Sequence, residues 1–145
     1  EVEITTTAYD GAAGDKSDPK DKNLDASKET VTIYDQVDYK GLNVGEEYTI
    51  TGTLHYQADA TLADGTQVKR GDEVPAQYVN VTPVKITANK ASSDESGAVK
   101  AIVKFEVQKT ALATAPVVVF ETLYQGTVEV ATHQDIDDGS QVVYH

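Results

Sequence analysis

The chain has 145 residues, a formal net charge of −12 and no cysteine, tryptophan or methionine. This length suits one domain with a real core, while the acidic charge argues against binding to nucleic acid or to anionic membrane surfaces. The lack of cysteine excludes disulfides and thiol chemistry.

Alternating apolar and polar residues predict a series of strands and no long helix. We expect strands over residues 2–8, 29–39, 47–56, 82–88, 97–108, 115–125, 127–133 and 140–144. The connections include a polar loop over 9–28, a protruding hairpin within 63–75 and one short turn near 108–114. The continuous apolar run after residue 115 is typical of a central strand. About eight strands of this kind predict an all-β, Ig-like sandwich.

No signal peptide or transmembrane run is present, and the sequence begins inside a predicted strand. We therefore expect residues 1–145 to form a single domain excised from a longer protein, with targeting signals elsewhere.

The acidic segment 135–141, DIDDGSQ, suggests a cation site or an ordinary turn. An EF-hand is excluded because Gly139 stands at the fifth position and no twelfth ligand follows, so a solvated turn is favoured and another cation site stays open. Three histidines without cysteine argue against zinc. Asn80 begins an N-V-T glycosylation motif that is common by chance. No nucleophile elbow or phosphate loop indicates a conventional enzyme.

Three side chains do not fit the apolar pattern around them. Asp35 lies in the apolar phase of its strand, Glu121 ends the run VVVFE, and His133 follows the strand VEVA. Buried carboxyls are costly unless they are paired or protonated. These three groups either meet inside the sandwich or each lie at a wet strand end.

Four blocks carry a resemblance to a known family: TTTAYDG…GDK, VTIYDQVDYKGLNVGEEYTITGTL, VVVFETLY and VATHQDIDDGSQ. In this order they resemble the Thr–Gln ester-bond domains, the VaFE repeats of Gram-positive surface adhesins, over residues 4–143. The resemblance implies an Ig-like sandwich of the collagen-adhesin B type with adjacent, covalently crosslinked first and last strands. It implies no cofactor and no metal.

The resemblance also assigns roles at matching positions. A first-strand threonine would attack the side-chain amide of Gln141 and release ammonia in a single-turnover, autocatalytic reaction that is not enzymatic turnover. His133, Glu121 and Asp35 would assist. Family spacing to the following Asp-Gly favours Thr5 as the nucleophile.

The threonine assignment leaves an alternative open, because Thr5, Thr6 and Thr7 are consecutive. Thr7 shares a strand face with Thr5 and is the next candidate, whereas Thr6 should point the other way. One departure from the family pattern is Val142, which replaces the threonine that usually follows the glutamine. The strand should survive because valine is β-branched, but any role of that hydroxyl is lost.

The function implied is a stalk module of a cell-wall-anchored bacterial adhesin on the cell surface, made stable by its crosslink. Its partners would be neighbouring domains of the same protein, with a host ligand bound through other domains, and we expect a monomer. The alternative is an uncrosslinked Ig-like domain that binds a ligand through residues 10–28 and 57–80. A Lys–Asn isopeptide domain fits less well, because Lys16 lies in a loop and Asn89 is far from the last strand.

Overall fold

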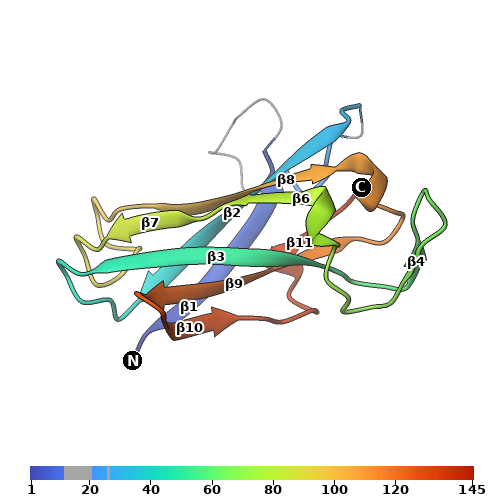
Figure 1. Cartoon of the computed structure of the whole chain (residues 1–145). Helices are drawn as coiled ribbons and strands as arrows, with labels where there is room; N and C mark the ends of the chain where they lie inside the picture. The colour runs from blue at the N-terminus through green and yellow to red at the C-terminus, as the bar shows by residue number, and fades with distance from the viewer. Residues whose placement is uncertain (12–20, 26) are drawn as a thin grey trace.

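The structure is a computed structural model that describes residues 1–11, 21–25 and 27–145, and it forms a sandwich of two antiparallel sheets (Figure 1). The first sheet has the order β1 (Glu3–Asp10), β2 (Thr30–Lys40), β8 (Ala101–Gln108) and β6 (Val79–Thr82). The second has the order β10 (Val128–His133), β9 (Val117–Gln125), β3 (Glu47–Tyr56) and β7 (Val84–Thr87), with β11 (Val142–Val143) also paired to β9.

A small separate hairpin consists of β4 (Ala60–Thr61) and β5 (Gln67–Val68). The helical segments of the described residues are three short 3-10 turns: η2 (Ala76–Tyr78), η3 (Lys109–Ala111) and η4 (Gly139–Gln141). No described helix has the length and apolar character to cross a membrane.

The predicted fold class is confirmed. The predicted central strand 115–125 is β9, which lies between β10 and β3. Two predicted strands are shorter in the structure: 97–108 begins only at Ala101, and 140–144 is reduced to Val142–Val143 after η4. One strand of the two sheets was missed: β6 covers the N-V-T motif at a sheet edge, where half-buried and exposed residues alternate over only four positions, too short a run to be recognised. Part of the predicted loop, residues 12–20 and 26, lies outside the described residues, and Lys16 lies there too.

The core between the sheets follows from the period-two pattern of the long strands. Ile33, Val103 and Phe105 from the first sheet meet Ile50 and Leu123 from the second, and all five are fully buried. Each of these strands sends every second side chain inward, which is how a sandwich fills its interior from two sheets.

The first strand lies at the edge of its sheet and closes one side of the sandwich. β1 pairs with β2 and also contacts β10, β11 and η4 of the other sheet. The first and last strands are therefore adjacent, as predicted, but they belong to different sheets. The two termini lie at opposite ends of the sandwich (Figure 1). Any link between β1 and the C-terminal segment would tie the two sheets together at this edge.

Candidate functional site

A group of four polar side chains is buried where β1 meets the other sheet. The exposed fraction is 2% for Thr6 and 0% for Asp35, Glu121 and Gln141. They come from β1, β2, β9 and η4 respectively, so the fold gathers them from four elements. Burial of polar side chains costs free energy unless they find partners, so this cluster calls for a chemical reason.

The Thr6 hydroxyl faces the Gln141 amide. Gln141 Nε2 donates a hydrogen bond to Thr6 Oγ1, and this side-chain contact joins residues 135 apart in the chain. A second bond fixes the same two segments, because Ser140 Oγ donates to the Thr6 carbonyl at 2.9 Å. The turn that presents Gln141 is capped by Asp138, whose carboxylate accepts from the Ser140 backbone N–H at 3.0 Å.

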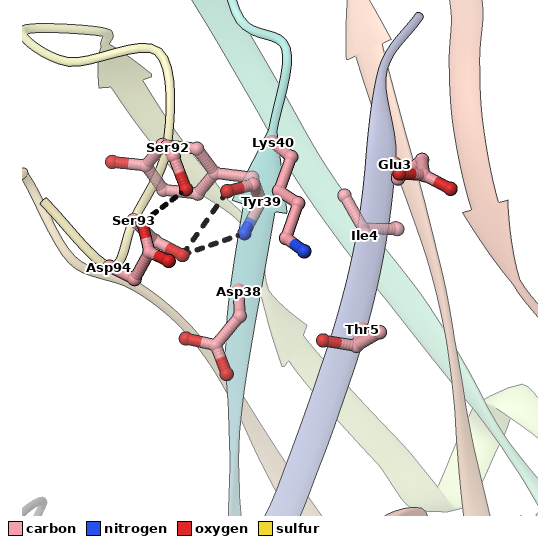
Figure 2. A pocket seen from close by; sticks show the side chains of 9 residues that line it. All are labelled: Glu3, Ile4, Thr5, Asp38, Tyr39, Lys40, Ser92, Ser93 and Asp94. Atoms are coloured by element: carbon pink, nitrogen blue, oxygen red, sulfur yellow. Dashed lines mark hydrogen bonds between the residues drawn. The ribbon is translucent and has the colours of Figure 1, made fainter.

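The structure does not bring Thr5 to this site. Thr5 is exposed, pairs with Asp38 and lines a surface pocket with Lys40, as Figure 2 shows. Thr7 is on the same outward face and only half-buried. The expectation that Thr5 faces Gln141 and that Thr6 points away is therefore wrong for this geometry.

The sequence already indicated which side chains of β1 point into the sandwich. Ile4 and Ala8 are buried, so the inward positions of this strand are the even ones, and Thr6 falls between them. The apolar alternation of Ile4 and Ala8 identifies the inward threonine, whereas spacing to Asp10 does not.

The two carboxyls form a tightly coupled pair. Burial raises the pKa of Asp35 to about 7, although the Glu121 carboxyl and the Thr6 hydroxyl lie close enough to oppose part of the rise. Burial, strengthened by the neighbouring Asp35, raises the pKa of Glu121 well above its usual range. Two carboxylates this close cannot both ionise without a large cost, so the pair holds at least one proton near neutral pH.

Several oxygens of the cluster lack hydrogen bonds of good geometry. Within the described residues, both carboxyl oxygens of Asp35, both of Glu121 and Oε1 of Gln141 are buried and unpartnered. An unmade hydrogen bond of a buried group costs about 1–3 kcal/mol. The cluster is thus costly as it stands, and a rearrangement of bonds within it would relieve that cost.

A glycine on the neighbouring strand makes the space for Glu121. Gly52 pairs with Glu121 across β3 and β9, so side chains at these two positions share a face. A Cβ at Gly52 would lie 2.6 Å from Glu121 Oε1 and would also collide with the Phe120 carbonyl. The missing side chain of Gly52 therefore creates the pocket that receives the carboxyl.

His133 lies at the rim of the cluster. It pairs with Glu121 across β10 and β9 and is near enough to Asp35 to lower that group's pKa electrostatically. Its Nε2 lies 2.6 Å from Asp138 Oδ2, so the imidazole is held by the acidic turn. Burial acts to raise the pKa of Asp138, but bonds from His133 and Ser140 hold that pKa below its usual value.

Comparison with known proteins shows the family of the chain. Residues 2–145 match the family described as the T-Q ester bond containing domain. The chain belongs to this family. It is a family of ester-bond-forming structural domains and not a catalytic enzyme family. No curated protein matches the chain in sequence.

Solved structures show the same fold. A bacterial adhesin from Mobiluncus mulieris, described as containing intramolecular disulfide, isopeptide and ester bond cross-links, matches in two crystal forms with TM-scores of 0.61 and 0.60. Identity is 20%, and the match covers 99% of this ester-bond domain but 56% of the adhesin chain. The C-terminal domain of a Streptococcus agalactiae AgI/II polypeptide gives a TM-score of 0.35 at 16% identity, over 98% of this chain and 49% of that chain, which is too low to support an argument.

The acidic turn of the ester-bond domain has roles that its sequence did not reveal. Asp138 caps η4 and holds His133, while Asp137 forms a 2.6 Å salt bridge with Arg70. No group of three or more potential metal ligands occurs among the described residues. The turn thus connects His133 with the segment that presents Gln141.

Proposed function

We propose that this domain forms an intramolecular ester between Thr6 Oγ1 and the side-chain carbonyl carbon of Gln141. The observation that supports it most directly is the contact between the buried Thr6 hydroxyl and the buried Gln141 amide. Proximity of this kind replaces a bimolecular encounter and can lower a barrier by roughly 7–11 kcal/mol when the geometry is good.

The reaction balances without any co-reactant. Thr6 Oγ1 forms a bond to Gln141 Cδ, the bond from Cδ to Nε2 breaks, and the hydroxyl proton leaves on ammonia. An amide is a poor electrophile and a hydroxyl a poor nucleophile, so proton transfer must accompany both steps.

The coupled carboxyls are suited to that proton transfer. In this proposal the ionised member of the pair accepts the Thr6 proton, and Asp35 is well placed because the Thr6 hydroxyl lies near enough to affect its pKa. The protonated member donates to the unpartnered Gln141 Oε1 as negative charge develops there. Both acids therefore serve in the reaction because one is charged and the other neutral.

His133 lies at the rim of the polar cluster, where it can assist the departure of ammonia. It is half-buried and bonded to Asp138, so it can exchange protons with solvent while it stays oriented. We assign it the delivery of a proton to the departing ammonia, and the proton that Asp35 accepts from Thr6 replaces the one that His133 gives up. Its replacement should slow the reaction and not abolish it.

The consequence of the bond would be mechanical and thermodynamic. Tension between the termini would pass through residues 1–6, the ester and residues 141–145, and would bypass the rest of the sandwich. Closing a loop of 135 residues would also restrict the unfolded chain. By analogy with disulfides, that restriction is worth on the order of 5 kcal/mol.

We further propose that the domain is a stalk module of a bacterial surface adhesin, anchored outside the cell and flanked by sibling domains. This rests on the family and on the fold shared with an adhesin chain of which this domain spans about half. Because the chain has no cysteine, any covalent crosslink in it must be of a kind other than a disulfide.

The proposal is tested by the intact mass of the denatured chain. A chain lighter than its sequence by one ammonia contains the ester, and tryptic digestion should then join the peptide of residues 1–16 to that of residues 110–145. An unchanged mass with two separate peptides would favour the uncrosslinked ligand-binding alternative.

A further inference from the structure

A short extended segment lies along both partners of the proposed crosslink. Residues 21–24 run beside the C-terminal strand, where Leu24 N–H donates to the Tyr144 carbonyl at 2.7 Å and Tyr144 N–H donates to the Lys22 carbonyl at 2.8 Å. The Asp10 N–H, at the end of β1, donates to the Asp21 carbonyl at 2.7 Å. We call residues 21–24 the strap, because it bonds to β1 at one end and to the chain after β11 at the other.

The strap carries one side chain into the gap between the two reacting segments. Lys22 Nζ donates to the Ala8 carbonyl and, at 2.9 Å, to the Ser140 carbonyl. Ala8 is two residues beyond Thr6 on β1, and Ser140 immediately precedes Gln141. One ammonium group therefore joins the backbones that carry the nucleophile and the electrophile.

The charge of Lys22 also faces the acids of the site. Ala8 pairs with Asp35 in the register of β1 and β2, so the ammonium bound to the Ala8 carbonyl is near that carboxyl. Asp35 and Asp138 both interact favourably with the Lys22 charge, whereas partial burial acts against it. A half-buried lysine with two carbonyls and two acids around it is better explained by this site than by surface solubility.

We propose that Lys22 is a positioning residue for ester formation: its ammonium clamps the Thr6 strand to the Gln141 turn. This inference rests on the proposed Thr6–Gln141 ester. Lys22 touches neither reacting side chain, so it acts through the backbones of Ala8 and Ser140 and through the field at Asp35.

Substitutions at Lys22 that remove or retain its charge and its hydrogen-bond donors test the proposal. Lys22→Met keeps the stem and removes both the charge and the donors, whereas Lys22→Arg retains them. Lys28→Met is the matched control, because Lys28 is an exposed lysine six residues further along the same connection. We expect Lys22→Met to form the ester about tenfold more slowly, equivalent to losing one charge-assisted hydrogen bond, with Lys22→Arg and Lys28→Met near the normal rate.

The experiment follows ester formation in newly made full chain. Each chain is produced in a short pulse of cell-free synthesis, quenched in acid at intervals, and scored by intact mass for loss of ammonia. Folding is checked by denaturant unfolding of the same variants in a Thr6→Val background, where no ester can form. Should Lys22→Met fail to fold there, Lys22→Gln, which keeps a neutral donor, takes its place in the comparison.

The outcomes separate the inference from the function on which it rests. A slow Lys22→Met or Lys22→Gln chain, rescued by Lys22→Arg, supports the positioning role. An ester formed as fast as in Lys28→Met, or a Lys22→Arg chain as slow as Lys22→Met, overturns it. If the unsubstituted chain never loses ammonia, the proposed ester itself is wrong.

Discussion

The interior of this sandwich has an apolar half and a polar half. Around Ile50 and Phe105 the core is apolar and fully buried, and it stabilises the fold by removing hydrocarbon from water. Around Thr6 and Glu121 the interior is polar, with buried oxygens that lack partners. Burial of these oxygens costs free energy in the unreacted chain, and the proposed reaction gives that cost a chemical reason.

That difference also explains why the polar half needs reinforcement. The apolar half lies between β3 and β8, which pair on both edges, while the outer wall of the polar half is β1, which pairs only with β2 among the described strands, together with η4 and the two-residue strand β11. A covalent bond placed in the polar half would strengthen the side of the sandwich where regular pairing is least extensive. The following substitutions act on one half or the other.

Removing the nucleophile should have the largest effect. Thr6→Val keeps the β-branched shape and deletes the hydroxyl, so the chain should retain its fold and lose the ester. We expect the free energy of unfolding to fall by on the order of 5 kcal/mol, measured by denaturant titration. Equal stability in Thr6→Val and the unsubstituted chain would mean that no crosslink depends on this residue.

Neutralising one member of the acid pair should come next. Glu121→Gln preserves size but removes a proton carrier, and we expect ester formation to slow about 10²–10⁴-fold, as is usual when an acid–base group is lost. The rate is measured by the appearance of the ammonia-depleted mass. Glu129→Gln, an exposed change on β10, is the matched control and should react normally.

The free energy of unfolding of the unreacted domain should depend on pH, because ionising the buried acid pair is unfavourable. Because the pKa of Asp35 is raised to about 7 when folded, the folded state binds more protons than the unfolded state between about pH 4 and 7. The contribution of Asp35 to the stability of a Thr6→Val chain should therefore be largest at and below about pH 4 and be lost as pH rises through 7. Adding Asp35→Asn should flatten that decline, and an unchanged slope would place the titration elsewhere.

Filling the space at Gly52 should disturb the polar half without replacing any of the reacting side chains. In Gly52→Ala the added methyl collides with Glu121 and with the Phe120 backbone, so we expect a loss of about 1–3 kcal/mol by overpacking. Ester formation should slow as well, because the carboxyl is displaced. A Gly52→Ala chain that reacts at the normal rate would show that the position of Glu121 is not critical.

A change confined to the apolar half should have the smallest effect. Ile50→Val removes one buried methyl group and should lower stability by about 0.5–1.5 kcal/mol. Its rate of ester formation should match that of the unsubstituted chain. A large change in rate would contradict the separation of the two halves.

Much of the fold followed from the sequence because its long strands alternate cleanly. The pattern also singled out Asp35, Glu121 and His133 as side chains out of phase, and the structure brings the two carboxyls together inside with His133 at their rim. Such positions are visible in sequence because a carboxyl in an apolar phase breaks a regular period.

Other parts of the site depend on contacts between segments far apart in the chain. Thr6 was expected to point outward because three consecutive threonines hide the strand phase, which Ile4 and Ala8 set. The roles of Gly52 and Lys22 arise from cross-strand and strap contacts that no local pattern encodes. Contacts between distant segments and between the two sheets become visible only in the folded chain.

The central claim is that Thr6, and not its neighbour, forms the bond to Gln141. The most direct measurement compares the intact masses of denatured Thr5→Val and Thr6→Val chains, since both threonines fall in one tryptic peptide. We expect Thr5→Val to be lighter than its sequence by one ammonia and Thr6→Val to have its full sequence mass. The reverse result, with ammonia lost only from Thr6→Val, would contradict the geometry of the site.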